Sequence, residues 1–334
     1  MNIPELEQKL TRLITSEKEV NVLLAFEMAK GSPQIQQALN QVLQVYYEIY
    51  SCFIEPEITS LQDIKATDIL YLNQAKLEIR NNDITKVPPE IDHLQNLETL
   101  NLSFNAITTL PATIGRLSQL KNLVLRFNQL TQLPNEITQL TQLTWLDLQG
   151  NLLTQLPPAI VQLQNLKNLH LSQNKLTHLP ADIGQLQALD TLDAERNQLT
   201  YLPEEIGRLS NLMVLQLEHN QINSLPDSIG QLKNLQLIRL IHNQLEDLPS
   251  DLSKLKKVYT IDLDNNRLQS LPLSICQLSN LTSLSLSNNQ INHLPEAIKK
   301  LDKLRFLNLT GNPMNASTIA QIKAWLPICR VTFD

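Results

Sequence analysis

Apolar and polar positions recur along most of the chain with a fixed period of 23 residues. Within residues 97–111, Leu100 and Leu102 are two positions apart, so both side chains point to the same side of an extended backbone. Leu or Ile fills the same two slots in repeat after repeat, with Ala194 as a departure. The pattern predicts one short strand per repeat, stacked in parallel at about 4.8 Å with the Leu face inward.

A turn inside such a stack buries backbone groups that need partners, and the chain places Asn at that turn. Asn carries an acceptor and two donors on one short side chain, so we expect it to bond the turn above and the turn below. Pro recurs with the same period one residue after a buried Leu, which predicts a short helical or 3-10 segment on the outer side. The Asn slots predict a continuous internal ladder, at positions 82, 105, 128, 151, 174, 197, 220, 243, 266, 289 and 312.

The first part of the chain breaks this period and predicts a helical cap. Pro4 to Ile14 has the pattern of an amphipathic helix. Ser16 to Glu19 predicts a capping box for a second helix that continues to Lys30. A third helix is expected to begin at Ser32-Pro33 and to end at Pro56. A solenoid with open ends exposes its core, so a cap of this kind is expected.

The two ends of the repeat array are less regular. Ile69–Leu72 predicts a strand that leads into the first repeat. After Asn312 the pattern favours a helix over 315–325 and a last short strand near 328–333. With both ends closed, we expect a complete chain in three parts: an N-terminal helical cap over 1–73, eleven repeats over 74–312 and a C-terminal cap over 313–334.

The segment from Leu179 to Pro203 is the clearest copy of the repeat, and it resembles the 23-residue class of leucine-rich repeats. That class occurs in bacterial cytosolic proteins, in Roco GTPases, in plant intracellular Ras-group repeat proteins and in Ras-pathway scaffolds. The resemblance implies an α/β solenoid, a leucine-rich-repeat horseshoe with a parallel concave sheet that binds proteins. It carries over no catalytic residue, and here the repeat domain has no attached enzyme.

The amino-acid composition limits which classes of partner and which cellular compartment we expect. A net charge of −6 and a pI of about 5.6 disfavour nucleic acid and anionic membranes. No 18-residue apolar run and no signal peptide is visible, so we expect no membrane insertion. Three Cys residues lie far apart, which favours a reducing setting. We expect a monomeric cytoplasmic protein; the alternative is secretion or delivery into a host without a recognisable signal peptide.

Four slots per repeat should line the concave face, and large apolar residues are informative there because polar side chains dominate. One predicted cluster joins Val124, Phe127 and Trp145, beside Arg126 and Asp147. For Phe127 two interpretations are open: it contacts a partner, or it folds back over the strand edge and only packs. Trp145 favours binding, since its slot holds Asn, Thr or Ser in most other repeats.

A second predicted cluster joins Val214, Leu237 and Ile241. Over the whole face the charged side chains are seven acidic and five basic, which is too balanced for electrostatics alone to select a partner. Around the two clusters, the further candidate partner-binding residues are His170, Asp193, Glu195, Glu218 and Arg239.

The sequence gives only weak indications of metal binding or catalysis. His219 and His242 occupy the same slot in adjacent repeats, near Glu195 and Glu218, and two His with two carboxylates could bind a divalent metal; a polar face that happens to carry His is the simpler interpretation. His170 could act as an acid–base group, but no nucleophile accompanies it. We therefore expect no catalytic residue, no cofactor and no resident metal.

Three hypotheses for function follow. The first is a non-enzymatic scaffold that binds a protein or peptide on the concave face. The second is a secreted bacterial effector or adhesin that uses the same face. The third, by analogy alone, is a regulatory scaffold for a small-GTPase pathway in signal transduction.

Overall fold

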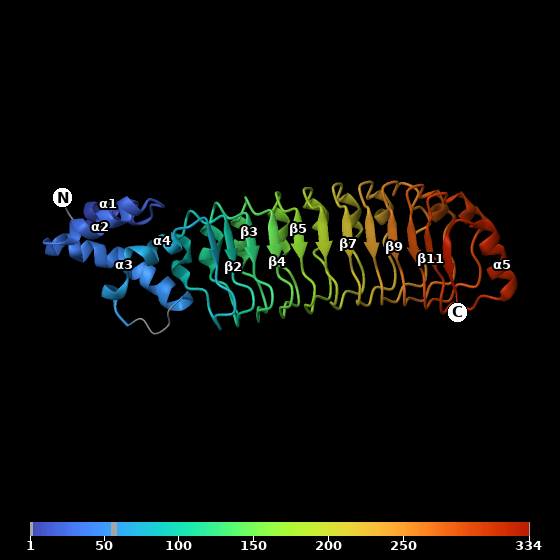
Figure 1. Ribbon diagram of the computed structural model, residues 1–334, viewed down its shortest axis with the longest axis horizontal. Helices are drawn as coiled ribbons and strands as arrows, with labels where there is room; N and C mark the ends of the chain where they lie inside the picture. The colour runs from blue at the N-terminus through green and yellow to red at the C-terminus, as the bar shows by residue number, and fades with distance from the viewer. Residues whose placement is uncertain (1–2, 55–58, 334) are drawn as a thin grey trace. The chain divides into compact units, whose positions relative to one another are not determined.

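The computed structural model describes residues 3–54 and 59–333, and the chain divides into two compact units, Met1–Leu146 and Asp147–Asp334. Helices at the N-terminus are followed by a ladder of short strands and 3-10 segments, and a helix lies near the C-terminus (Figure 1). Each unit has its own core, which consists mostly of the Leu and Ile side chains of the periodic slots.

The first unit begins with three helices where three were predicted: α1 (Ile3–Ile14), α2 (Glu19–Ala29) and α3 (Pro33–Phe53). Leu6 and Leu10 on α1 are buried, because their spacing places both on one face of the helix. The predicted end of the third helix at Pro56 lies outside the described residues.

The predicted capping box at Ser16 to Glu19 was wrong. The N-cap of α2 is Lys18, which makes no side-chain cap hydrogen bond. The Ser16 hydroxyl instead accepts hydrogen bonds from the backbone N–H of Lys18 and from the side chain of Asn21. Ser16 therefore organises the turn before the helix.

The predicted strand at Ile69–Leu72 was also wrong, because these residues belong to helix α4 (Ala66–Leu72), which follows the 3-10 segment η1 (Leu61–Asp63). The Asp68 carboxylate accepts a hydrogen bond from the Lys65 backbone N–H at 2.8 Å and fixes the start of this helix. Ile69 and Leu72 are both fully buried, and a spacing of three places them on one helical face, whereas in a strand they would face opposite sides.

The repeats form short parallel strands in register, each paired with the strand 23 residues away, as Leu192 is with Leu215. In the first unit β1 pairs with β2 and β2 with β3. In the second unit β5 to β12 pair in sequence order. The strands are β1 (Lys76–Glu78), β2 (Thr99–Asn101), β3 (Asn122–Val124), β4 (Trp145–Asp147), β5 (Asn168–His170), β6 (Thr191–Asp193), β7 (Val214–Gln216), β8 (Leu237–Arg239), β9 (Thr260–Asp262), β10 (Ser283–Ser285), β11 (Phe306–Asn308) and β12 (Arg330–Thr332).

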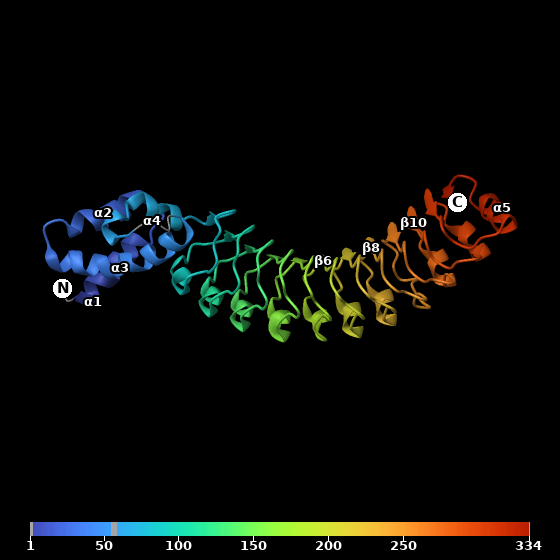
Figure 2. The ribbon, with the colours of Figure 1, turned by 90° about the horizontal axis from the view of Figure 1, so that it is seen from below.

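A 3-10 segment follows nine of the ten Pro slots, as predicted, whereas Pro249 is followed by turns. Pro111, for example, is the extended residue before η3, and its carbonyl accepts from the backbone N–H of Ile114. In the second unit the strands line the inner side of the curve and the 3-10 segments the outer side (Figure 2). These segments are η2 (Pro89–His93), η3 (Ala112–Arg116), η4 (Asn135–Gln139), η5 (Pro158–Gln162), η6 (Ile183–Gln185), η7 (Glu204–Arg208), η8 (Asp227–Gln231), η9 (Leu273–Gln277) and η10 (Glu296–Lys300).

The internal Asn ladder is confirmed, but each Asn side chain bonds one neighbouring repeat instead of both. The Asn174 side chain donates to the carbonyl of Leu171 in its own turn and to that of Leu148 in the preceding repeat, and it accepts from the N–H of Leu153. Each Asn therefore joins its own turn to the preceding repeat only, and the link to the next repeat comes from the next Asn. Asn82, at the start of the ladder, is exposed.

The C-terminal part ends as predicted. Helix α5 (Ala316–Trp325) begins at Asn315, whose side chain accepts from the N–H of Thr318 at 2.9 Å. Strand β12 then pairs in parallel with β11. No helix in the described part of the chain is long and apolar enough to cross a membrane.

Candidate functional site

The sheet face is the surface formed by four outward slots per repeat, which in the β7 repeat are Val214, Gln216, Glu218 and His219. Between them the Leu side chains point inward, so the strands alternate half-buried and buried positions. Every candidate binding residue from the sequence lies in one of these slots.

The fourth slot has a left-handed backbone in every repeat, with φ between 51° and 71°. The side chains held in this way stack along the edge of the sheet, and the Asn288 amide donates to Asn265 at 3.0 Å. Sequence reasoning missed this feature, because bulky residues seldom adopt such a backbone. The residues are Asn81, Phe104, Phe127, Gly150, Gln173, Arg196, His219, His242, Asn265, Asn288 and Gly311.

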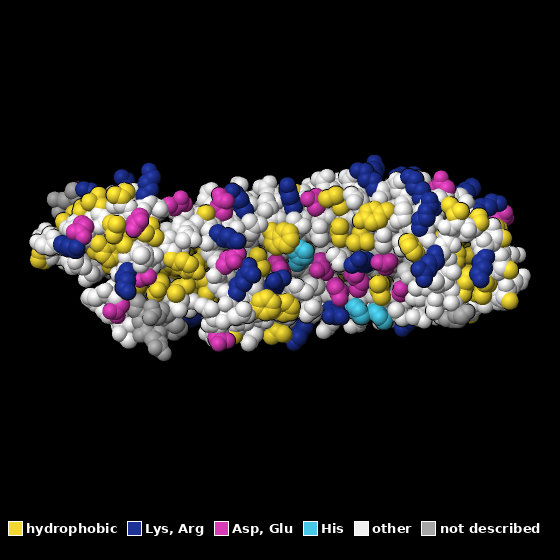
Figure 3. Space-filling view, viewed as in Figure 1, with side chains coloured by type: hydrophobic (Ala, Val, Ile, Leu, Met, Phe, Trp, Pro, Cys, Tyr) yellow, Lys and Arg dark blue, Asp and Glu magenta, His cyan; other side chains and the backbone are white. Residues whose placement is uncertain are grey.

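Acidic side chains gather on the sheet face of the second unit, around β7 and β9 (Figure 3). Arg196 and Arg239 are the basic side chains in the slots of the same four repeats, so the local charge is negative. The balance predicted for the whole face does not hold here. We define the acidic patch as Asp193, Glu195, Glu218, Asp262 and Asp264.

Arg239 lies between two carboxylates of the acidic patch. Its Nε is 3.4 Å from Asp262 Oδ2 and 3.9 Å from Glu218 Oε1, so the contact with Glu218 is longer than a hydrogen bond. Burial raises the pKa of Asp262, and the neighbouring guanidinium of Arg239 partly offsets this effect. Arg239 is thus held more closely by Asp262 than by Glu218.

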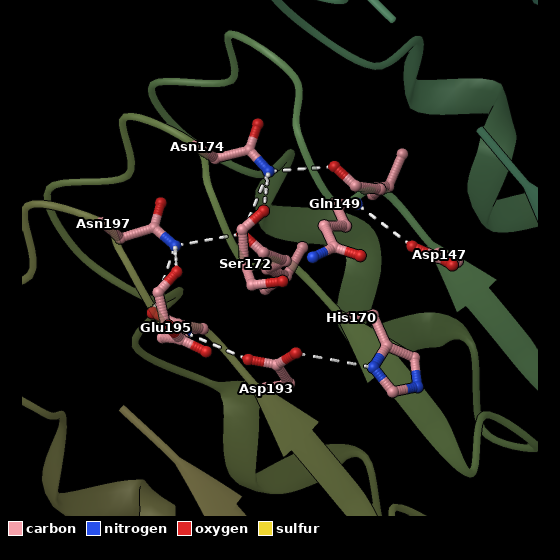
Figure 4. Close-up of polar contacts among 11 residues, drawn as sticks. Asp147, Gln149, His170, Ser172, Asn174, Asp193, Glu195 and Asn197 are labelled. Carbon is pink, nitrogen blue, oxygen red and sulfur yellow. Dashed lines mark hydrogen bonds and ion pairs between the residues drawn. The ribbon is translucent and has the colours of Figure 1, made fainter. Parts of the chain in front are cut away.

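Most carboxylates of the patch have partners within the protein. Asp193 accepts from the backbone N–H of Glu195 at 3.1 Å and faces the imidazole of His170 at 3.7 Å (Figure 4). Asp264 accepts from the hydroxyl of Ser285 and from the backbone N–H of Ser287, both at 2.6 Å. These carboxylates therefore also hold the turns that follow the strands.

Glu218 differs from its neighbours. The residue is only 7% exposed, yet its Oε2 has no hydrogen-bond partner among the described residues. Burial raises the pKa of its carboxyl, and the nearby charge of Glu195 raises it further, while Arg239 lowers it. A buried and incompletely paired carboxylate on an outward slot is costly for the fold.

Apolar side chains occupy other outward slots of the same two repeats. Val214 and Leu237 are register partners on β7 and β8, and Ile241 occupies the same slot as Glu218 one repeat later. All three are half-buried, as the predicted second cluster requires. Beyond Asp262 the sheet face contains a hollow of about 350 Å³ over β9 to β12, where the ring of Phe306 is 55% exposed.

The two histidines of the fourth slot stack on each other, with ring centroids 4.4 Å apart. Burial lowers the pKa of His219, and the adjacent His242 lowers it further. Among the described residues, no group of three or more His, Cys, Asp or Glu side chains is arranged to hold a metal ion. The stack is a contact between rings, and its geometry does not add the two carboxylates that a metal site would need.

The first unit carries the aromatic cluster. Phe104 and Phe127 stack with centroids 4.8 Å apart, and the guanidinium of Arg126 lies 5.4 Å from the centre of the Phe104 ring. Phe127 thus packs along the edge, which supports the second of its two interpretations. Val124 and Trp145 are half-buried on the outward slots of β3 and β4.

Two family models match the chain. A model described as a leucine-rich repeat region matches residues 113–192 and 165–244, and one described as a leucine rich repeat matches 75–130 and 256–314. A comparison with curated proteins finds no match.

Solved structures share the architecture. The functional domain of InlJ from Listeria monocytogenes is 26% identical, with a TM-score of 0.66 over 80% of this chain and 55% of that one. The LRR ectodomain of the receptor kinase GASSHO1/SCHENGEN3 from Arabidopsis thaliana, in complex with CASPARIAN STRIP INTEGRITY FACTOR 2, is 32% identical, with a TM-score of 0.66 over 72% and 30%. The plant peptide hormone receptor RGFR1 in complex with RGF2 is 27% identical, with a TM-score of 0.61 over 78% and 50%. The chain thus spans between 30% and 55% of the length of these three proteins.

Proposed function

Because the chain belongs to the leucine-rich-repeat family, whose fold is a protein–protein interaction module, we propose that it is a non-enzymatic module that binds a protein or peptide on its sheet face. The proposal concerns each unit's own sheet face. It assigns binding to the apolar and charged outward slots, and it assigns the Leu core and the Asn ladder to stability alone.

The observation that carries the proposal is the composition of the second unit's sheet face. Val214, Leu237 and Ile241 stand half-exposed beside the acidic patch, in slots that hold Thr, Ser or other polar residues in most neighbouring repeats. Apolar side chains next to charged ones, on a surface built from rigid strands, have the composition of a protein-binding hot spot.

The solved relatives support a peptide or protein as the ligand. GASSHO1/SCHENGEN3 is described in complex with CASPARIAN STRIP INTEGRITY FACTOR 2, and RGFR1 is described as a plant peptide hormone receptor in complex with RGF2. Both are more than 25% identical to this chain over more than two thirds of its length. A similar use of the sheet face here is part of the proposal.

Two single substitutions test the proposal in affinity capture from the native lysate. Leu237→Asp places a charge in the apolar cluster of the second unit, and Trp145→Ala removes the largest side chain of the outward slots in the first unit. Each variant should lose partners that the wild type captures, because hot-spot residues carry much of the binding free energy. Mass spectrometry with isotope labelling measures the loss partner by partner.

Matched controls separate binding from folding. Leu273→Asp and Tyr201→Ala change exposed side chains outside the sheet-face slots, at 67% and 51% exposure. They should capture the same partners as the wild type, and all four variants should keep the wild-type circular dichroism spectrum. Recovery of the same partners at the same strength by Leu237→Asp and Trp145→Ala would show that the sheet face is not the binding surface.

A cytoplasmic location is part of the proposal, and it is supported by three cysteines that are all free thiols: Cys52, Cys276 and Cys329. The alternative is a secreted bacterial effector or adhesin. Fractionation of the native host distinguishes the two, because recovery in the medium or on the cell surface supports the alternative. Capture that depends on the nucleotide state of a GTPase would support the small-GTPase scaffold.

A further inference from the structure

Glu218 is the carboxylate of the acidic patch that hydrogen bonds and ion pairs within the protein compensate least. It is more than nine-tenths buried, its Oε2 has no hydrogen-bond partner among the described residues, and its Oε1 is 3.9 Å from Arg239. Within residues 3–54 and 59–333, the Glu218 carboxyl is hydrogen-bonded only by its own backbone N–H, whereas Asp193 and Asp264 accept hydrogen bonds from the backbone N–H groups of other residues. An ionised group in this position gains free energy when a cation reaches it.

The charges around Glu218 select the sign of the ligand. Asp193 and Glu195 raise the local negative potential at its carboxyl, and Arg239 is the opposing charge. Arg239 has a second, closer carboxylate in Asp262 at 3.4 Å, and its side chain is 42% exposed. Arg239 can therefore stay with Asp262 while another cation pairs with Glu218.

The side chains next to Glu218 select an organic cation over a metal ion. Ile241, in the Glu218 slot one repeat later, offers aliphatic carbon beside the carboxylate, and Val214 and Leu237 extend the apolar surface two outward slots away, whereas Ca²⁺ and Mg²⁺ require a shell of six or more oxygen ligands. No metal-holding group of three or more His, Cys, Asp or Glu occurs in the part of the chain that the structure describes. Lys and Arg match such a site, because a methylene stem packs on apolar surface and ends in a charge.

We infer that the acidic patch binds a lysine or arginine side chain of the partner, with Glu218 as the anchoring carboxylate, Ile241 packed on its stem, and Val214 and Leu237 in contact with neighbouring residues of the partner. This inference rests on the proposed function, and it names the chemistry that the second unit's sheet face recognises. Arg239 partly neutralises Glu218 in the free protein and stays with Asp262, its closer carboxylate, when the ligand enters.

The test is a selection from a random dodecapeptide library displayed on phage, carried out in parallel on the wild type, Glu218→Gln and Leu237→Asp. The wild type should enrich peptides with a Lys or Arg at a fixed position, and Glu218→Gln should lose that enrichment. Glu204→Gln on η7 is the matched control, since it removes an exposed carboxylate away from the sheet face and should enrich the same peptides as the wild type.

A double-mutant cycle then measures the contact itself. Replacing the basic residue of a selected peptide by Gln, or Glu218 by Gln, should each weaken binding about tenfold or more, and the two changes together should weaken it little further. Additive losses would overturn the inference.

The outcomes separate the inference from the proposed function. Peptides that lose binding with Leu237→Asp but show no basic preference, or that bind Glu218→Gln as well as the wild type, overturn the inference and leave the function standing. A selection that gives no peptide dependent on Leu237 contradicts both.

Discussion

The side-chain oxygen of Asn220 accepts a hydrogen bond from the backbone N–H of Leu199, one repeat earlier, at 2.9 Å. The Asn220 amide also donates to the carbonyls of Ala194 and Leu217. Asn220→Ala would leave these buried groups without partners, so we expect it to lower the free energy of unfolding by about 3 kcal/mol or more. Urea denaturation followed by circular dichroism measures the change.

Asn223→Ala is the control for the ladder, because Asn223 is exposed three residues further along the same repeat. Its effect should stay within about 0.5 kcal/mol. If Asn220→Ala unfolds at the same urea concentration as Asn223→Ala, the ladder does not hold the repeats together.

Glu218 should lower the stability of the fold at neutral pH. Burial raises the pKa of its carboxyl, so the folded state binds the proton more tightly than the unfolded state does. The cost of the ionised group is therefore complete above the folded-state pKa, and it disappears as the pH falls from that value to the ordinary pKa of a Glu carboxyl. Glu218→Gln should raise the melting temperature by a few degrees at pH 8, and the gain should shrink toward pH 4.

Glu204→Gln again serves as the control, since it should leave the melting temperature unchanged at both pH values. A Glu218→Gln variant that melts below the wild type at pH 8 would mean that the carboxylate stabilises the free protein. That outcome would also remove the energetic reason for a cationic ligand.

The left-handed backbone of the fourth slot leads to a prediction for Gln173, where φ is 57°. A β-branched side chain is strained in this backbone, so Gln173→Val should lower the free energy of unfolding by roughly 1–3 kcal/mol. Gln173→Asn should be neutral or stabilising, because Asn tolerates this conformation and occupies the slot at Asn265. Gln198→Val, at an exposed position outside the slot, is the matched control, and equal losses for both Val variants would contradict the strain argument.

The fold could be predicted from the sequence wherever one residue type fills a slot for one physical reason. The Asn ladder and the inward Leu positions followed from hydrogen-bonding capacity and strand periodicity. The left-handed slot could not, because Phe104, Arg196 and His242 do not prefer that backbone and the stacked repeats impose it. Ile69–Leu72 was assigned to a strand because a short apolar segment does not distinguish helix from strand without its cap at Asp68.

The candidate site was partly visible in the sequence. The slot pattern predicted the apolar cluster around Leu237 and its acidic neighbours. The charge count over the whole face, however, combined residues from different repeats, so it did not show that the acidic residues are concentrated in a few of them. Sorting the same charges by repeat would have shown the acidic patch. The burial of Glu218 and the preference of Arg239 for Asp262 depend on side-chain positions that no slot pattern encodes.

The stacked histidines give a prediction about titration. Burial is the first cause that lowers the pKa of His219, and the neighbouring His242 is the second. His242→Asn should therefore raise the pKa of His219 toward its ordinary value of about 6.5 without reaching it. The fold should tolerate the change, because Asn occupies the same slot at Asn265. An NMR titration of the imidazole Cε1 protons measures the shift.

The lowered pKa of His219 also affects how stability depends on pH. A lowered pKa means that the folded state resists protonation of His219, so its contribution to stability falls as the pH drops through the ordinary value. His242→Asn should reduce that loss. His293→Asn, an exposed histidine elsewhere, should leave the titration of His219 unchanged. An unchanged pKa of His219 in His242→Asn would show that His242 does not contribute to the shift and that the ring stack carries no electrostatic coupling.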